Sequence, residues 1–337
     1  MTDLSTLGVA SLGVWTRADA LTLLTPGEID ALVRAGVWQT PWRAVYADGG
    51  CDLSAEQRAV AACLASGGAG QPFPYGPPDP VTGKRRRRLR AVAAGRTAAR
   101  VYDLPLIDDH DPATGTVEHL LDDVAVFRHL PALTKDGRTL YRRQERLTAE
   151  EVVRRPGGLW VTSPVRTLVD CASLLTHEAL VCALDNALHR ECDLLPKLVQ
   201  AAADRQGAVG APALRHGLAL ADGRAESAAE TLARLILLPV LPGLRPQVRL
   251  FDHAARLVAR FDLGDEEIRL AVESDGQAGH AGERMVAKDQ RRDLRTKSFG
   301  WSTERATWYD LRRRQDEFRA RVVAKDTELR ADRDQTA

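Results

Sequence analysis

The chain has 337 residues, of which 44% are hydrophobic and 28% charged, and its net charge is +1. This length indicates two or three domains of a globular protein, and the near-neutral total charge does not by itself point to a nucleic-acid partner. Five cysteines without CxxC spacing argue against a zinc site or a disulfide framework. Without a signal peptide or an apolar run of about 18 residues, we expect a cytoplasmic protein that does not enter the membrane.

Residues 1–50 predict a winged helix-turn-helix domain. A helix over residues 16–24 has Thr16 as its N-cap, with Asp19 at the third helical position. Residues 25–27 form the turn, and residues 28–35 form a second short helix that ends at Gly36. The aromatic-rich residues 37–46 suit a short β-wing. Helix, turn, helix and wing together make the winged-helix plan.

Residues 51–222 predict a mixed, mainly helical middle domain. It opens with an alanine-rich helix, and residues 71–90 interrupt it with five prolines followed by a basic run. Irregular, strand-like pieces follow. A helical segment then begins at Ser163 and Pro164, a cap and first-turn proline in the expected order.

Residues 223–325 predict a third domain, which a tail over residues 326–337 follows. The pattern is a helix from residue 226, three short strands ending at residue 274, a charged helix over residues 282–299, a strand over residues 301–307 and a closing helix over residues 310–324. This order suits a restriction-endonuclease-like α/β core, so the whole chain is an α+β multidomain protein.

Carboxylates end two successive strands of this third domain. Asp262 follows one apolar run, and Glu273 and Asp275 follow the next. A hairpin would place Asp262 beside the start of the third strand, and a twisted sheet would place it beside Glu273; the sequence leaves both placements open. Carboxylates at short range bind Mg²⁺, or Mn²⁺, which polarises a phosphate and activates water.

Glu226 and Glu230 are four residues apart, so we expect them to lie on one face of the first helix of this domain. An acidic residue of that helix would add a further ligand to the metal. Glu226 is our candidate third metal ligand. The alternative is that both are exposed helix acids, with Glu230 pairing Arg234.

The third domain resembles a bacterial family related to very-short-patch-repair endonucleases, within the PD-(D/E)xK nuclease superfamily. The resemblance covers residues 224–311 and rests on GRAESAAETLARLIL, LVARFDLG, IRLAVESDG and KDQRRDLRTKSFGW. The N-terminal pieces VWTRADAL, IDALVRAGVW and VYA resemble the winged-helix region of AbiEi-type antitoxins from type IV toxin–antitoxin systems. GRTAARVYDL and VTSPVRTLVDCA are similar to the middle region of actinobacterial members.

The resemblance implies that Asp262 and Glu273 are the metal-binding pair of a catalytic site. Asp275 stands where the superfamily motif has its lysine. His280 in the following loop and Lys288 in the next helix are the candidates to replace that lysine.

Three groups of basic residues are candidate DNA contacts. The winged-helix region contributes Arg17, Arg34 and Arg43, although its second helix offers few base-reading side chains. The other groups are the basic run of the proline-rich loop (Lys84, Arg85, Arg86, Arg87 and Arg88) and three arginines near the third domain's charged helix (Arg291, Arg292 and Arg295).

Three hypotheses follow. The first is a DNA-binding protein with a metal-dependent nuclease-like domain, a possible endodeoxyribonuclease. The second is a non-catalytic, antitoxin-like transcriptional regulator in which the nuclease-like fold is a scaffold. The third is a module that sequesters a cognate toxin protein. The carboxylates favour the first, whereas Asp275 at the lysine position and the antitoxin-like N-terminus favour the second.

Overall fold

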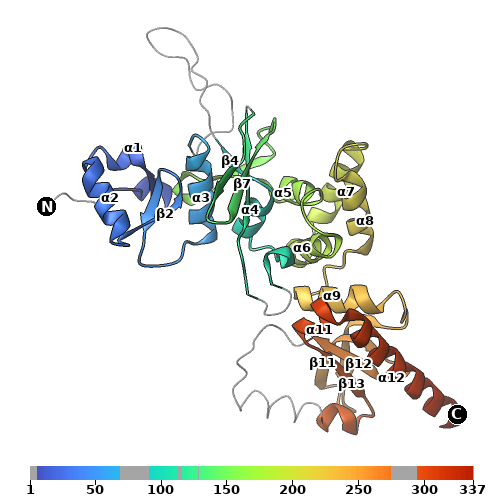
Figure 1. Cartoon of the computed structure of the whole chain (residues 1–337). Helices are drawn as coiled ribbons and strands as arrows, with labels where there is room; N and C mark the ends of the chain where they lie inside the picture. Colours follow the sequence, from blue (N-terminus) through green and yellow to red (C-terminus); the bar gives the residue numbers. More distant parts are fainter. Residues whose placement is uncertain (1–5, 69–90, 112–115, 128, 275–293, 337) are drawn as a thin grey trace. The chain divides into compact units, whose positions relative to one another are not determined.

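The chain is a mixed α+β protein. The computed structural model describes residues 6–68, 91–111, 116–127, 129–274 and 294–336. These residues contain three sheets and divide into two compact units, each built from separated parts of the chain (Figure 1). The first unit comprises Met1–Leu106, His119–Leu175 and Lys197–Leu214, and the second comprises Ile107–Glu118, Thr176–Pro196 and Arg215–Ala337.

The N-terminal part of the first unit contains two short helices and a three-stranded antiparallel sheet. The strand order is β1-β3-β2. Trp15 and Trp38 meet edge to face, with ring centroids 4.9 Å apart, in a small core that also holds Ile29. The elements are β1 (Val14–Thr16), α1 (Arg17–Ala20), α2 (Pro26–Arg34), β2 (Trp38–Trp42) and β3 (Val45–Asp48).

Both helix starts in this part follow from side-chain caps. Thr16 caps α1 in a capping box with Asp19, as the sequence predicts. The turn predicted at residues 25–27 is wrong, because Thr25 caps α2 in a second capping box with Glu28 and the helix begins at Pro26. Gly36, at φ 70°, follows the end of α2 as predicted.

A six-stranded mixed sheet, which the sequence analysis does not predict, forms the centre of the first unit, although helices hold more of the described residues of the middle region than strands do. Its strand order is β6-β7-β5-β4-β9-β8. Strands β4 and β9 are parallel, as are β5 and β7, and the other neighbours are antiparallel. The strands are β4 (Val92–Ala93), β5 (Leu121–Val126), β6 (Leu133–Lys135), β7 (Arg138–Gln144), β8 (Val152–Arg154) and β9 (Trp160–Thr162).

Helices pack with this sheet to form the largest core of the unit. Buried residues of α3, including Val60, pack with Val124, Leu140 and Val161 from three of its strands. Ser163 caps α5 as predicted. The remaining helices of the first 222 residues are α3 (Ala55–Ala65), α4 (Gly95–Val101), α5 (Pro164–Cys171), α6 (His177–Arg190), α7 (Leu194–Asp204) and α8 (Ala211–Leu220), with short 3₁₀ segments at Val9–Ser11, Ile107–Asp109 and Pro156–Gly158.

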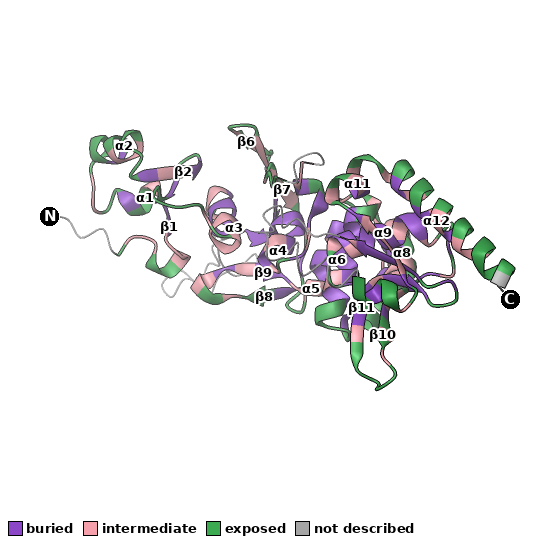
Figure 2. Cartoon of the chain, turned by 90° about the horizontal axis from the view of Figure 1, so that it is seen from below, coloured by how far each residue is buried: buried purple, intermediate pink, exposed green. Residues whose placement is uncertain are grey.

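The sheet of the second unit has the strand order β10-β11-β12-β13. The first three strands are antiparallel to one another, and β13 runs parallel to β12. Buried residues concentrate in the strands and in helices such as α6 and α9, whereas the tip of the β10–β11 hairpin is exposed (Figure 2). The elements are α9 (Ala228–Leu237), β10 (Arg245–Phe251), β11 (Leu257–Asp265), β12 (Leu270–Ser274), β13 (Ser302–Ala306), α11 (Trp308–Arg313) and α12 (Gln315–Thr336).

The C-terminal end differs from the sequence prediction in two ways. The single closing helix expected over residues 310–324 is two helices, α11 and α12. The expected tail over residues 326–337 is helical through Thr336, as the C-terminal part of α12. Arg330 holds this part by ion pairs with Asp326 and, 3.0 Å away, with Asp265 at the end of β11.

Cys63, Cys171 and Cys182 are buried, and Cys51 and Cys192 are exposed. Cys192 follows the end of α6. Within the described ranges, none of the helices is long and apolar enough to cross a bilayer.

Candidate functional site

Strands β11 and β12 carry the two principal carboxylates. Leu263 pairs with Val272, and Gly264 pairs with Ala271. Continuing this antiparallel register by one residue sets Asp262 opposite Glu273. Of the two placements that the sequence leaves open, the register therefore favours the one beside Glu273.

The Asp262 carboxylate is held from the end of β12. Its Oδ2 accepts hydrogen bonds from the backbone N–H of Ser274, at 2.8 Å, and from the Ser274 hydroxyl, at 2.7 Å. Glu273, the residue before Ser274, is buried, with 7% of its surface exposed. These neutral donors orient Asp262 without cancelling its charge, which a cation site requires.

Glu226 and Glu230 do not share a helix face as predicted. Ser227 is the N-cap of α9, so Glu226 precedes the helix. Both oxygens of Glu226 accept from the Arg260 guanidinium, at 2.6 and 2.7 Å. This bidentate ion pair neutralises Glu226.

Glu230 is engaged by neutral groups instead. Its Oε2 accepts from the backbone N–H of Glu226, at 3.0 Å, and from Nε2 of Gln247, at 2.8 Å. The alternative pairing with Arg234 is wrong, because that guanidinium binds Asp185, at 2.7 Å. Among the described residues, no basic side chain forms a salt bridge with Glu230, so its negative charge is left uncompensated.

Electrostatic coupling joins Glu226, Glu230 and Asp262, and with Glu273, opposite Asp262 in the register, these residues are defined as the acidic cluster. Burial raises the pKa of Glu230, and the charge of Asp262 raises it further. The pKa of Arg260 is raised by its hydrogen bonds to Glu226 and by the charges of Glu230 and Asp262. Within the described residues, Glu230 and Asp262 therefore carry negative charge beyond that paired in the Arg260–Glu226 salt bridge.

The oxygen donors of the cluster fit a hydrated divalent cation. Within the described part of the chain, His, Cys, Asp and Glu side chains do not form a group of three placed to hold a metal ion. Mg²⁺, however, is usually bound through one or two carboxylates and keeps several waters. Asp262 and Glu273, with Glu230 nearby, meet that requirement. Gln247 adds a buried amide oxygen without a hydrogen-bond partner in the described structure.

Several predicted site residues lie outside the described residues. They are Asp275, His280, Lys288, Arg291 and Arg292 of the third domain, together with Lys84, Arg85, Arg86, Arg87 and Arg88 of the proline-rich loop.

The remaining predicted DNA contacts differ in how free their guanidinium groups are. Arg17 is engaged by Asp30, at 3.1 Å, and by the Tyr46 hydroxyl, at 2.9 Å. Arg34 is exposed near the end of α2, where its Nε donates to the Asp30 carbonyl. Arg43 is exposed in the turn between β2 and β3, the tip of the predicted wing. Arg34 and Arg43 are thus better placed than Arg17 to reach a phosphate.

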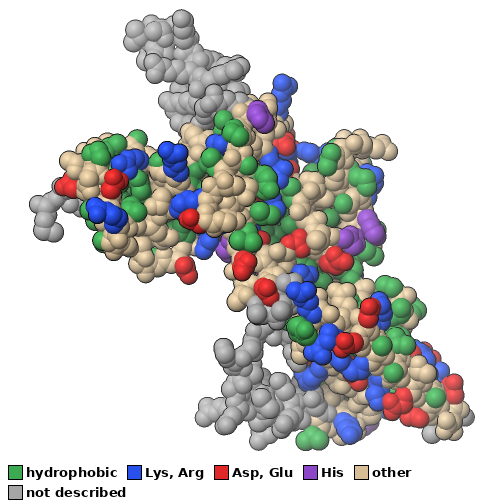
Figure 3. Space-filling model, in the orientation of Figure 1, with side chains coloured by type: hydrophobic (Ala, Val, Ile, Leu, Met, Phe, Trp, Pro, Cys, Tyr) green, Lys and Arg blue, Asp and Glu red, His purple; other side chains and the backbone are tan. Residues whose placement is uncertain are grey.

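Arg295 is exposed. The pKa of Asp252 is lowered mainly by hydrogen bonds from the backbone of Arg256 and Ala254, and to a smaller extent by the charge of Arg295. Arg295 therefore lies near the tip of the β10–β11 hairpin, where Asp252 lies. Figure 3 shows Lys and Arg side chains beside Asp and Glu on the visible face of the second unit.

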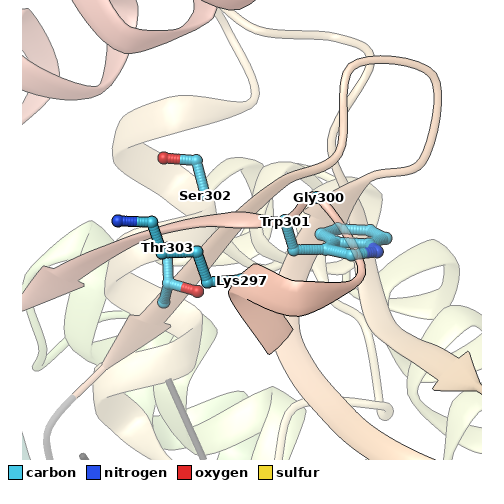
Figure 4. A pocket seen from close by; sticks show the side chains of 5 residues that line it. All are labelled: Lys297, Gly300, Trp301, Ser302 and Thr303. Atoms are coloured by element: carbon cyan, nitrogen blue, oxygen red, sulfur yellow. The ribbon is translucent and has the colours of Figure 1, made fainter. Parts of the chain in front are cut away.

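A cavity of about 490 Å³ lies at the start of β13. Figure 4 shows its lining residues, which are Lys297, Gly300, Trp301, Ser302 and Thr303. Ser302 and Thr303 pair with Leu270 and Ala271, whereas Glu273 pairs with Arg305 further along. The acidic cluster does not line this cavity.

The first unit contains a second concentration of charge, on β5. Asp123 is bound by Arg96, at 2.7 Å, and by Arg143, at 2.8 Å. Asp122 is bound by Arg100, at 3.0 Å, and by Arg138, at 2.9 Å. Because each buried aspartate is matched by two arginines, this network holds the fold together and leaves no negative charge for a cation.

The helix cap at Ser227 has a signal in the sequence, whereas the contact of Gln247 with Glu230 has none. Ser227 and Glu230 have the S-x-x-E spacing of a helix start, which would have separated Glu226 from the helix. The contact of Gln247 with Glu230 spans 17 residues and carries no local signal.

The fold and this cluster define a mixed α+β protein with an acidic cluster in its second unit. Two proteins of Mycobacterium tuberculosis, the uncharacterized protein Rv2248 of strain ATCC 25618 / H37Rv and the uncharacterized protein MT2308 of strain CDC 1551 / Oshkosh, are each 30% identical to this chain over 234 residues. The match covers 69% of this chain and 80% of each relative. The chain belongs to the same family as these two proteins. The sequence matches no family model, and no solved structure matches it.

Proposed function

We propose that this is a DNA-binding protein whose second unit is a PD-(D/E)xK-type, metal-dependent nuclease-like domain. The observation that carries the proposal is the register of β11 and β12, which sets Asp262 beside Glu273. The order of elements around them supports it: α9, three antiparallel strands, and β13 parallel to β12.

In this proposal Asp262 and Glu273 would hold Mg²⁺ or Mn²⁺ directly and Glu230 would act through a water on the cation, which would polarise a phosphodiester and activate water. Glu230 replaces Glu226 as the acidic residue from the α9 side, because Arg260 already neutralises Glu226. Ser274 orients Asp262 through two hydrogen bonds. The basic side chain that replaces the motif's lysine in catalysis is His280 or Lys288, because Asp275 occupies the lysine position.

DNA is the partner that best fits the first unit. Two helices followed by a β2–β3 hairpin make a winged-helix arrangement, with Arg34 on α2 and Arg43 at the hairpin turn. The same arrangement favours a second candidate function, an antitoxin-like transcriptional regulator that does not cleave DNA and has a cognate toxin partner. Asp275 at the lysine position also favours this candidate.

Thermal unfolding with and without divalent cation tests the site. We expect Mg²⁺ or Mn²⁺ at about 100 times its Kd to stabilise the native protein by about 2.7 kcal/mol. Asp262→Asn and Glu230→Gln should abolish most of the rise in Tm. Glu267→Gln is the control, since it breaks an exposed ion pair with Arg333 in the same unit and should keep the cation response.

A cleavage assay on supercoiled and linear DNA with Mg²⁺ then separates the two functions. Glu273→Gln should remove any cleavage by the native protein. If the cation raises Tm but neither DNA is cut, the regulator is favoured. A native protein whose Tm does not respond to either cation refutes the metal site.

A further inference from the structure

Gln247 has an unusual backbone conformation for a residue in the middle of a strand. Its φ is +57°, in the left-handed region that a side chain larger than Asn or Asp rarely adopts. Pro246 pairs with Leu263, and Val248 pairs with Phe261. Gln247 therefore lies across from Asp262, and the distortion of β10 occurs directly beside the acidic cluster.

The Gln247 side chain makes one strong contact and leaves one group unused. Nε2 donates to Glu230 Oε2 at 2.8 Å. The amide oxygen Oε1 is buried and accepts no hydrogen bond from the described residues. A buried acceptor without a donor is unfavourable, and natural structures retain such groups mainly where an unseen water, ion or catalytic role completes them.

The chemistry of an amide suits a residue that supports a cation site. An arginine at this position would orient Glu230 but would also neutralise it, as Arg260 does to Glu226. The neutral Gln247 amide orients the carboxylate and leaves its charge available. Strained backbone is concentrated at functional sites, because it can hold a side chain in a position that a regular strand would not allow.

We propose that Gln247 is a positioning residue of the cation site, which orients the Glu230 carboxylate and accepts a hydrogen bond through Oε1 from a water on the bound cation. This inference rests on the proposed function, because it needs a divalent cation at Asp262 and Glu273. It adds a neutral residue from β10 to a site otherwise made of carboxylates from β11, β12 and α9. Supporting residues of this kind typically change metal affinity by about 10–100-fold when they are replaced.

Titration of the full-length protein with Mn²⁺ by calorimetry tests this role. Gln247→Gly removes the side chain and relieves the left-handed backbone, so the cation-free protein should melt at or above the native Tm. Its Kd for Mn²⁺ should nevertheless rise by about 10–100-fold. A residue with only a structural role would change the cation-free Tm and leave this Kd unchanged.

Ala255→Gly is the matched control. Ala255, at φ +55° in the turn of the same hairpin, gains the same backbone relief but lies away from the cluster. Its Kd for Mn²⁺ should equal the native value. Gln247→Asn, which tolerates a left-handed φ but is one methylene too short to keep the contact, should repeat the loss seen with glycine.

The outcomes separate the two proposals. If the native protein binds no Mn²⁺, the proposed cation site fails. If the native protein binds Mn²⁺ and both Gln247 variants bind it within about twofold of the native Kd, the cation site stands and the role of Gln247 is refuted.

Discussion

The partners of each acidic side chain decide whether it supports the fold or is available to a ligand. Asp122, Asp123 and Asp185 are buried and bound by arginines. Asp262 and Glu230 are instead held by a serine, a backbone N–H and an amide. Sequence spacing identified Asp262 and Glu273 as candidates, but it could not reveal that Arg260 neutralises Glu226 and that Gln247 contacts Glu230.

Asp170 offers a test of the electrostatics of the first unit. It lies 2.7 Å from Arg166, which also binds Glu145 and Glu151, each at 2.9 Å. Burial raises the pKa of Asp170 to about 6, against the attraction of Arg166. Between the ordinary pKa of an aspartate and pH 6, the native protein therefore binds more protons at Asp170 than the unfolded chain does. The free energy of unfolding falls as pH rises through this range.

We expect this site to remove about 2–3 kcal/mol of the free energy of unfolding between pH 4 and pH 6.5. The pKa of Glu151 is lowered despite its burial, because hydrogen bonds from Thr148 and Arg166 stabilise its charged form, so its own effect is confined to the acid end of that range. Asp170→Asn should flatten the dependence of the free energy of unfolding on pH, as measured by urea unfolding at a series of pH values. An unchanged slope above pH 5 would contradict the raised pKa.

At the scale of elements, sequence patterns succeeded where apolar and polar residues alternate along a strand. The three runs that became β10, β11 and β12 alternate apolar and polar residues and are joined by short turns. The six-stranded sheet was missed because its strands are short, and because β5 contains Asp122 and Asp123 in succession. Their arginine partners lie 16 to 27 residues away, so a local pattern could not show that these charges are neutralised within the core.

The start of α2 was missed for a different reason. Thr25, Pro26 and Gly27 have the composition of a turn, yet Thr25 and Glu28 have capping-box spacing. Thr25→Ala removes the cap on a candidate DNA-contacting helix. We expect a loss of about 1 kcal/mol from the free energy of unfolding, measured with denaturant.

Thr22→Ala is the control for this prediction. The Thr22 hydroxyl donates to the Asp19 carbonyl but caps no helix start. It should change the free energy of unfolding by less than about 0.5 kcal/mol. Equal losses for the two variants would show that the α2 cap contributes nothing specific.

At the scale of the whole molecule, the path of the chain departs most from the domains expected from sequence. A boundary near residue 222 separates α6 from the sheet-containing segment that follows it. The second unit nevertheless includes Thr176–Pro196, which contains α6. Composition and proline content indicate linkers, but they cannot show that an earlier helix returns to pack on a later one.

Asp185 on α6 explains why this helix belongs to the second unit. It is fully buried, and its carboxylate accepts from Arg234 and Thr231 of α9, at 2.7 and 2.8 Å. It also accepts from the Asp222 N–H, at 2.7 Å. Arg234 is itself 5% exposed, so removing α6 would take away both this partner and part of the surface that buries α9.

A fragment of residues 223–337 should therefore fold less stably than a fragment of residues 176–337, although both contain the whole acidic cluster. Breaking a buried ion pair by removing one partner typically costs about 3–5 kcal/mol, a large share of the stability of a small domain. Thermal unfolding followed by circular dichroism should show a cooperative transition for the longer fragment, and a transition at lower temperature or none for the shorter fragment.

Asp185→Ala in the full-length protein isolates the ion pair and should lower Tm without changing the Kd for Mn²⁺. If the shorter fragment melts as cooperatively and at the same temperature as the longer one, α6 is not part of this folding unit, and the boundary near residue 222 is the correct one.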